Sequence, residues 1–274
     1  MHRFFIPPHW INSDQVTFQN PVAHQISHVL RLRLGDAVIV LDNLGYEYDV
    51  DLTACGTVAQ GQVMARRRAG NEPGCLVSMY LSLTQREKFE WMLQKCTEVG
   101  AVEFIPMVTG RSLVGRSQGI EEAWTLKKNE RWARIIQEAA EQSGRGRLPV
   151  LHRPLSFKDA VDSAREKADQ AYIPYEGEKS RGLVQAIDLA QGAPQRLALL
   201  IGPEGGFSGE EIELAESAGI FPVSLGRRIL RMETAAIVAL ALAINALELR
   251  ASNDNTHVIQ AKPGSDQEHT DHPG

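Results

Sequence analysis

The sequence has few of the residues that hold small secreted or metal-dependent proteins together. Its 274 residues include only three cysteines, at positions 55, 75 and 96, and no two of them have C-x-x-C spacing. An odd number at these spacings provides neither a disulfide framework nor a zinc site. The histidines near the carboxyl end are isolated in a polar stretch, so we expect no metal site.

Long hydrophobic runs and a secretory leader are also missing. The longest apolar run, residues 235–247, is shorter than the roughly 18 residues that suggest a membrane span. The opening MHRFFIPPHW has no apolar segment after its basic residue, unlike a signal peptide. We therefore expect a cytoplasmic protein with no membrane partner.

A strong positive charge is absent too. The net charge is −5, from 29 basic and 34 acidic residues, and residues 1–250 alone hold 28 and 30. A nearly neutral body binds a polyanion only through local patches. The candidate RNA-binding residues are Arg3, Arg31, Arg33, Arg111, Arg145 and Arg147, with the arginine run at 66–68. Such arginines are also typical of a solvated surface, which is the alternative interpretation of each.

The chain divides into two regions of different periodicity, and its 43% hydrophobic content is enough for two cores. Residues 1–70 show short β-like runs at 38–41, 46–52 and 58–64, with one short helix near 22–30. Turn formers in AGNEPG place a linker at 71–74. Residues 251–274 lack apolar periodicity, so we expect a disordered tail there.

From residue 75 to 250, strand-like and helix-like segments alternate. Strands are expected at 76–83, 102–108, 171–173, 197–201 and 221–225, and helices at 84–99, at 121–142 and from 156. A Ser208 and Glu211 capping box starts another helix, and a Thr84 and Glu87 pair suggests a second such box. The alternation predicts an α/β domain whose parallel sheet is covered on both faces.

Two unusual loops follow neighbouring strands of this region. The first is GPEGGF at 202–207 and the second is GRRILRMET at 226–234, which leads into an alanine-rich helix at 235–249. That helix is apolar on most of its circumference, so it must be buried against the sheet or a partner. Loops at the carboxyl ends of parallel strands are where open α/β sheets bind ligands.

The glycines of the first loop favour close approach of a ligand to the backbone. The spacing fits neither the phosphate-binding P-loop nor G-x-G-x-x-G, which disfavours a phosphate cradle. The alternative is that these glycines only form turns.

Both loops carry a specific resemblance. GPEGGFSGEE followed by SLGRRILRMETA resembles the carboxyl-terminal signature of the SPOUT methyltransferases, and within them the ribosomal RNA small subunit methyltransferase E family. The resemblance continues through QKCTEVGAVEFIPMVTGRS, EAAEQSGRGRLPV, YIPYEGE, HRFFIP and HVLRLRLGD, and so covers His2 to about Arg250. One departure is Met232, which stands where the family usually has threonine.

This resemblance implies a fold and a function. The fold would be α/β, with an amino-terminal PUA-like small β-barrel that binds RNA and a SPOUT domain with a deep trefoil knot. The function would be S-adenosylmethionine-dependent methylation of N3 of a uridine in 16S rRNA of the small ribosomal subunit. The enzyme would be a homodimer with an active site built across two chains.

The resemblance and the accessibility of the backbone also assign residues. The expected cofactor-binding residues are Glu176, Ile201, Gly202, Glu204, Gly205, Gly206, Leu225, Gly226, Ile229, Leu230 and Thr234. Arg231 would stabilise negative charge on the uracil, because a guanidinium keeps its charge and presents a fork of donors. Glu233 is the candidate base, although next to a helix it could instead cap the amino end.

Two other functions remain open at the level of sequence. The chain could bind the ribosome without catalysis, or it could be a SPOUT enzyme that modifies a ribose 2′-hydroxyl or a guanine.

Overall fold

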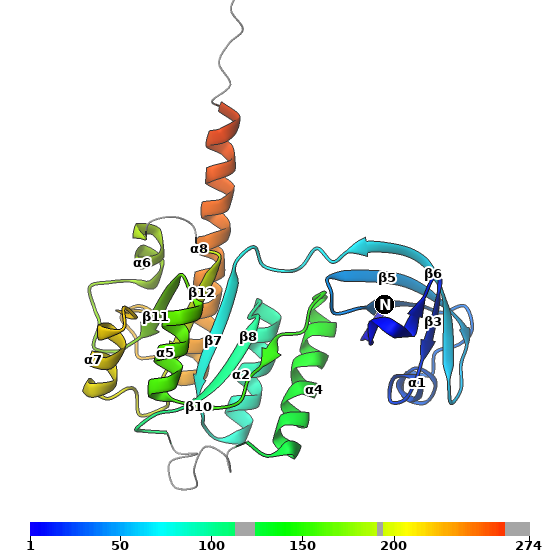
Figure 1. The fold of residues 1–274 in the computed structure, drawn as a ribbon, viewed down its shortest axis with the longest axis horizontal. Coiled ribbons are helices and arrows are strands. Elements are labelled where there is room, and N and C mark those ends of the chain that lie inside the picture. Colours follow the sequence, from blue (N-terminus) through cyan, green and yellow to red (C-terminus); the bar gives the residue numbers. More distant parts are fainter. Residues whose placement is uncertain (113–123, 191–193, 261–274) are drawn as a thin grey trace, which may run out of the picture.

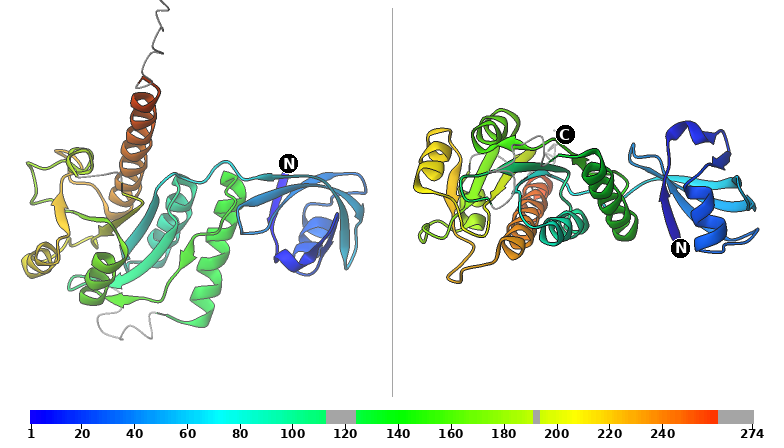
Figure 2. Two further views of the ribbon diagram at one scale, coloured as in Figure 1. Left: turned by 45° about the horizontal axis from the view of Figure 1, so that its top comes forward. Right: turned by 90° about the horizontal axis from the view of Figure 1, so that it is seen from below.

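The structure is a computed structural model that describes residues 1–112, 124–190 and 194–260, without the side chains of 251–260. Two β-sheets lie side by side, joined by residues 69–75, and one long helix projects from the second (Figure 1). Views from other directions show the same separation into a small and a large body (Figure 2).

The first sheet has six strands in the order β1-β4-β5-β6-β3-β2. Only its β1 and β4 pair is parallel, and the other four pairs are antiparallel. Its elements are β1 (His2–Phe5), a 3-10 turn (Pro8–Trp10), β2 (Ile11–Asn12), β3 (Gln15–Phe18), α1 (Val22–His24), a π-helical turn (Gln25–Val29), β4 (Ala37–Leu41), β5 (Tyr46–Ala54) and β6 (Ala59–Arg68). The three predicted strands and the short helix are therefore present, whereas β1, β2 and β3 were not predicted.

The second sheet has seven strands in the order β10-β8-β7-β12-β11-β13, with β9 also paired to β8. All of its pairs are parallel, as the alternating pattern predicted. Its elements are β7 (Leu76–Ser82), α2 (Arg86–Val99), β8 (Glu103–Val108), α4 (Leu126–Ser143), β9 (Val150–Leu151), β10 (Leu155–Ser156), α5 (Phe157–Lys167), β11 (Gln170–Pro174), α6 (Leu183–Leu189), β12 (Arg196–Ile201), α7 (Gly209–Ser217), β13 (Phe221–Val223) and α8 (Met232–Gln260).

The central strand β12 shows why this sheet must be covered on both faces. Leu197, Leu199 and Ile201 lie in one hydrophobic core, with side chains of α2, α4, α6 and α8. Ala198 and Leu200 point to the other face and pack with α5 and α7. Successive side chains of a strand alternate between faces, so an uninterrupted apolar run needs a layer of helices on each side.

Local capping fixes several helix ends. The capping box of α7 forms as predicted, with the Ser208 hydroxyl accepting from Glu211 N–H and the Glu211 carboxylate accepting from Ser208 N–H. Helix α4 begins one residue after Thr125, whose side chain accepts from Lys128 N–H. The part of its predicted span at 121–123 lies outside the described residues.

The predicted capping box at Thr84 and Glu87 is wrong. Helix α2 begins at Arg86, after Gln85, and it has no side-chain cap. The Thr84 hydroxyl instead donates to the carboxylate of Glu204, which lies 120 positions away in the chain. A tertiary acceptor has replaced the local one that the spacing suggested.

Helix α8 is longer than predicted at both ends. It begins at Met232 rather than 235 and continues to Gln260, into the stretch for which the sequence predicts a disordered tail. Elongating an existing helix costs little, because each added residue gains a hydrogen bond without a new nucleus. The rest of the predicted tail, 261–274, lies outside the described residues.

By length and composition, Met232–Arg250 of α8 could cross a membrane. The same test is passed by helices in the cores of soluble proteins. Here Ala236, Ala239, Leu240 and Ala243 are buried in the core beside β12. Packing within its own chain therefore accounts for much of the apolar character of α8.

Candidate functional site

A large cleft lies at the carboxyl ends of β11, β12 and β13. Its volume is about 1080 Å³. Almost all of the predicted site comes together there: Glu176, Ile201, Gly202, Glu204, Gly205, Gly206, Leu225, Gly226, Ile229, Leu230, Arg231 and Glu233. The loop after β13 is tied to the loop after β11, since Ser224 N–H donates to Arg181 O and Leu183 N–H donates to Ser224 O.

One predicted cofactor residue, Thr234, does not line the cleft. Helix α8 already begins at Met232, so Thr234 is part of its first turn and is exposed. Sequence reasoning missed other lining residues: Lys88, Tyr175, Glu178, Lys179, Phe207, Ser224, Arg227, Arg228 and Met232. Arg227 and Arg228 stood inside the motif and could have been chosen, whereas Lys88 is on α2 and gave no local signal.

The glycines of the first loop are required by its packing. A Cβ on Gly202 would lie 2.9 Å from the Phe207 ring. A Cβ on Gly206 would lie 2.6 Å from a carboxylate oxygen of Glu176, and Gly206 has φ +68°. The positive φ at Gly206 and both close contacts disfavour a side chain, so packing within the chain already favours glycine here and the turn interpretation stays open.

Glu204 anchors the first loop to α2. Its Oε1 accepts from the Thr84 hydroxyl at 2.5 Å and from Lys88 Nζ at 2.9 Å. Burial acts to raise the pKa of Glu204, but the hydrogen bonds from Thr84 and Lys88 outweigh it, and the pKa is lowered. Glu204 therefore stays ionised and fixes one wall of the cleft.

At the rim, Glu178 is also held as a carboxylate. It accepts from the Ser180 hydroxyl and from the backbone N–H groups of Ser180 and Arg181. These bonds lower the pKa of Glu178 to about 2. Acidic and basic side chains thus share the rim of the cleft.

The second loop brings Arg231 and Glu233 to the cleft. Arg231 is exposed, and its carbonyl accepts from Ala235 N–H at 2.8 Å in the first turn of α8. Glu233 Oε2 is buried and has no hydrogen-bond partner in the part of the chain that the structure describes. No hydrogen bond of the Glu233 side chain to the amino end of α8 is seen there, and Glu233 lines the cleft. Met232 is 4% exposed and packs in the core below.

The predicted RNA-binding arginines have different fates. Arg145 is 2% exposed and donates to Thr97 O, Ala101 O and Glu72, so direct RNA contact by Arg145 is excluded. It satisfies buried carbonyls that would otherwise be orphaned. Arg3 forms an ion pair with Glu47.

The other four arginines of that set are exposed. Arg147 donates to Leu44 O at 3.0 Å, and Arg111 donates to the first loop of the cleft. The guanidiniums of Arg31 and Arg33 have no hydrogen bond or ion pair within the described residues.

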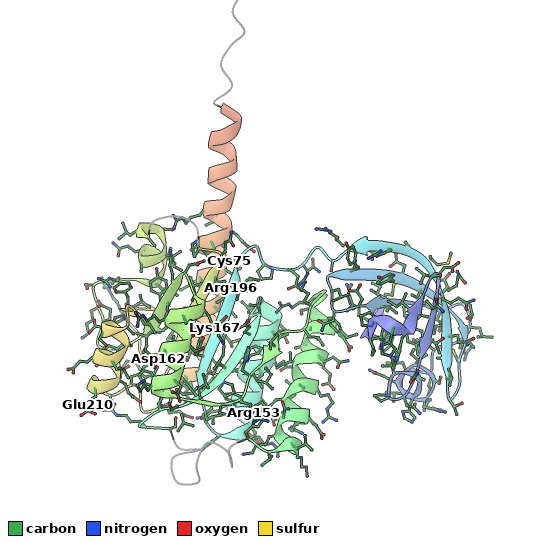
Figure 3. All side chains as sticks on the ribbon, viewed as in Figure 1. Cys75, Arg153, Asp162, Lys167, Arg196 and Glu210 are labelled. Carbon is green, nitrogen blue, oxygen red and sulfur yellow. The ribbon has the colours of Figure 1, made fainter. Side chains whose placement is uncertain are left out.

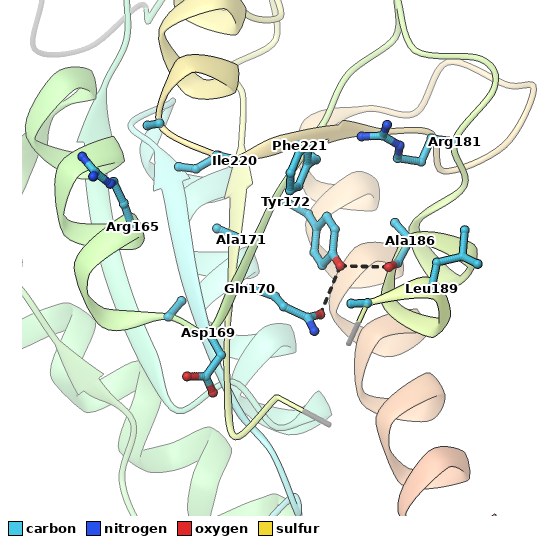
Figure 4. A pocket seen from close by; sticks show the side chains of 14 residues that line it. Arg165, Asp169, Gln170, Ala171, Tyr172, Arg181, Ala186, Leu189, Ile220 and Phe221 are labelled. Atoms are coloured by element: carbon cyan, nitrogen blue, oxygen red, sulfur yellow. Dashed lines mark hydrogen bonds between the residues drawn. The ribbon is translucent and has the colours of Figure 1, made fainter. Parts of the chain in front are cut away.

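A second cavity of about 400 Å³ lies near the start of β11, away from the two loops (Figure 4). Two of its polar side chains, Tyr172 and Asp169, already have hydrogen-bond partners. Tyr172 donates to Gln170 and to Ala186 O, and Asp169 accepts from the backbone of Gln195 and Arg196. We therefore place the functional site in the larger cleft.

The cysteines are free thiols. Cys55 is exposed, while Cys75 and Cys96 are buried. Burial raises the pKa of Cys75 to about 11 and that of Cys96 to about 12. Cys75 lies near Arg196, just before strand β7 (Figure 3). Among the described residues, no group of three His, Cys, Asp or Glu could hold a metal.

Residues 71–244 match the RNA methyltransferase domain family. The chain is 37% identical to the ribosomal RNA small subunit methyltransferase E of Synechocystis, over 90% of this chain and 78% of that protein. It is 34% identical to the Bacillus subtilis protein of the same name, over 80% and 85% of the two chains.

Solved structures share the fold. A putative methyltransferase from Legionella pneumophila, in complex with S-adenosylmethionine, superposes with TM-score 0.77 and 27% identity over 90% of this chain and 97% of that one. A Neisseria gonorrhoeae ribosomal RNA small subunit methyltransferase E superposes with TM-score 0.78 at 24% identity, over 90% and 98% of the two chains. With the family motifs gathered around one cleft, these matches show that the chain belongs to the ribosomal RNA small subunit methyltransferase E family.

Proposed function

We propose that this protein transfers the methyl group of S-adenosylmethionine to N3 of a uridine in 16S rRNA, on the small ribosomal subunit in the cytoplasm. The observation that carries the proposal is the cleft itself, in which both family loops meet at the carboxyl edge of a parallel sheet.

The chemistry of the cleft fits this cofactor. S-adenosylmethionine supplies an activated methyl group, and its amine and ribose hydroxyls are hydrogen-bond donors. The buried, unpartnered Oε2 of Glu233 is an acceptor for such a donor. Gly202, Gly205, Gly206 and Gly226 would hold the cofactor through their backbone, because they leave no side chain in the way. Leu225, Ile229 and Leu230 would provide apolar contacts.

Arg231 is our candidate for catalysis. The N3 atom of uracil carries a proton, and it becomes a good nucleophile only when that proton leaves. A guanidinium beside the ring would stabilise the negative charge on the uracil oxygens and so favour loss of the proton. Glu233 lines the same cleft and is our candidate for the carboxylate that accepts this proton.

The first domain carries exposed arginines that could contact RNA. Arg31 and Arg33 are exposed there, and Arg66 lies over the ring of Tyr46 at 4.0 Å. Cations next to an aromatic face suit phosphates and stacked bases. We propose this surface, within a PUA-like barrel, as the contact that recognises rRNA.

We also propose a homodimer and a deep trefoil knot, as in the SPOUT superfamily. The exposed apolar side chains Ile229 and Leu249, at 88% and 58%, support a partner against the second loop and α8. The bonds that join residues 181–183 to Ser224 support a threaded arrangement of the loops.

The decisive experiment is mass spectrometry of nucleosides from 30S subunits that lack this modification, after incubation with enzyme and S-adenosylmethionine. We expect 3-methyluridine. A 2′-O-methyl nucleoside or a methylguanosine would instead support the other regiochemistry. The absence of any methylated product, with intact 30S binding, would support a non-catalytic ribosome-binding module.

A further inference from the structure

The loop that follows β8 is built to hold one arginine in place. Thr109 and Ser112 are each 3% exposed, and the Ser112 hydroxyl accepts from Thr109 N–H at 3.0 Å. The two hydroxyl oxygens also lie 2.8 Å apart. Gly110 N–H donates to Glu211 Oε1 at 2.7 Å, which ties this turn to the first residues of α7. Arg111 stands within the turn.

Arg111 reaches from this turn to the first loop of the cleft. Its Nη1 donates to the carbonyl oxygens of Gly205 at 2.9 Å and Phe207 at 3.2 Å. The stem of the side chain lies against Gly205, where a Cβ would be 3.3 Å from the Cβ of Arg111. The glycine at 205 therefore makes room for the arginine as well as for a ligand.

These bonds fix the orientation of two peptide groups. In a trans peptide the C=O and the following N–H point in opposite directions. Opposite the Gly205 carbonyl, Gly206 N–H donates to Pro203 O, and opposite the Phe207 carbonyl, Ser208 N–H donates to Glu211. Both peptide groups are thus held at both ends.

The peptide group between them joins Gly206 to Phe207. Within the described parts of the chain, neither Gly206 O nor Phe207 N–H has a hydrogen-bond partner. Gly206 and Phe207 both line the cleft. Buried or ligand-facing backbone groups need partners, so this donor and acceptor suit a bound molecule.

We propose that Arg111 is a positioning residue that sets the backbone of Gly205, Gly206 and Phe207 for the cofactor, rather than a residue that binds RNA. This inference rests on the proposed cofactor site. The acceptors that Arg111 bonds to are neutral carbonyls, so the hydrogen-bond donors of its guanidinium matter more than its charge. A phosphate contact would depend on the charge instead.

The test compares Arg111→Met with Arg111→Lys, and uses Arg153→Met as the matched control. Arg153 is exposed in the same domain (Figure 3) and is not among the residues that line the cleft. Calorimetry without RNA should show S-adenosylmethionine binding about tenfold weaker for Arg111→Met, as expected for one or two lost hydrogen bonds. Arg111→Lys should recover part of the affinity, and Arg153→Met should bind like the wild type.

A second measurement needs no cofactor. Amide hydrogen exchange of the unliganded protein should be faster in residues 202–208 of Arg111→Met and unchanged in α5, with an unfolding midpoint close to that of the wild type. Unchanged exchange and unchanged cofactor affinity in Arg111→Met would overturn the proposal. Weaker RNA binding with a shallower salt dependence and normal cofactor affinity would overturn it in favour of a phosphate contact.

Gly205→Val separates this inference from the proposed function. A β-branched side chain at 205 meets both the ligand space and the Arg111 stem, so it should abolish cofactor binding in a folded protein. If Gly205→Val binds S-adenosylmethionine normally, the cofactor site itself is wrong. If it does not bind but Arg111→Met does so normally, only the role of Arg111 is wrong.

Discussion

At the scale of single residues, the surroundings of each arginine decide its role. Arg145 is buried and neutralised by Glu72, while Arg231 is exposed at the cleft. Arg111 is exposed as well, but its donors are directed at backbone carbonyls. Charge alone therefore does not identify an RNA contact.

Arg231→Ala should separate catalysis from binding. If Arg231 stabilises the uracil anion, turnover should fall by about 10²- to 10³-fold with cofactor affinity near that of the wild type. Residual activity should rise more steeply at alkaline pH, because the N3 proton must now leave without help from a cation. Single-turnover rates and calorimetry measure these effects.

Arg231→Lys is the matched control for that experiment. It keeps the charge and loses the planar fork, so it should rescue a phosphate contact and not a bidentate one. Normal turnover and a normal pH profile in Arg231→Ala would direct attention to Glu233.

Glu141→Gln should change how stability depends on pH. Burial raises the pKa of Glu141, whose Oε1 accepts from Phe5 N–H at the domain contact. When the pKa of a carboxyl is higher in the folded state, its contribution to the free energy of unfolding is fully present below the unfolded-state pKa of about 4.3. That contribution is lost as pH rises through the folded-state pKa. The variant should therefore melt higher than the wild type at pH 7, and the difference should shrink towards pH 4. A variant that melts lower at pH 7 would contradict this.

At the scale of elements, α8 uses its circumference for two purposes. One side, with Ala236, Leu240 and Ala243, completes the core of the second sheet. Burial of apolar surface stabilises such a core by about 25 cal/mol per Å². Ala241 and Leu249 are exposed on another side. Ala239 and Ala243 lie on the buried side, so an arginine at either position would disrupt this core. Such a variant would damage the monomer and would not test for a dimer.

Ala241→Arg therefore tests the proposed dimer. A long charged side chain at an exposed position should leave the monomer folded and disrupt only a partner contact. We expect light scattering to show the mass of one chain, with circular dichroism like that of the wild type. Glu210→Arg on α7 is a control on a helix away from α8. A dimer of unchanged affinity in Ala241→Arg would show that the partner packs elsewhere.

At the scale of the whole molecule, Glu72 fastens the linker between the two domains to the second domain. Its carboxylate accepts from Arg145 and from the N–H groups of Gly146 and Arg147, and Asn71 next to it donates to Gly144 O. Alternate residues of β1 and β4, Phe5, Ile39 and Leu41, pack on Ala140 of α4 and so place the first domain against the second.

Glu72→Gln should weaken this junction. The change leaves the buried guanidinium of Arg145 without its ion-pair partner, which costs about 3 kcal/mol when a buried pair is broken. We expect a lower unfolding midpoint and faster proteolysis within residues 69–75. Glu138→Gln, in an exposed pair with Arg134, is the control and should change little. Equal stability of the two variants would show that Glu72 does not hold the junction.

The sequence determined the parallel sheet and the two loops of the site, because these depend on local signals. An apolar run such as residues 197–201 must be covered on both faces, and Ser208 with Glu211 must cap the helix that follows. Nearly all of the site residues predicted from the motifs therefore line the cleft, whereas other lining residues, such as Lys88 and Tyr175, were not predicted.

Only the tertiary structure decided contacts between distant segments. Thr84 follows a valid local capping pattern, yet its hydroxyl bonds to Glu204, and Arg145 is buried against a carboxylate 73 positions away. Lys88 reaches the cleft from α2, and Arg111 bonds to the first loop from the turn after β8. Nothing in the spacing of these residues encodes their partners, because packing of the whole sheet brings them together.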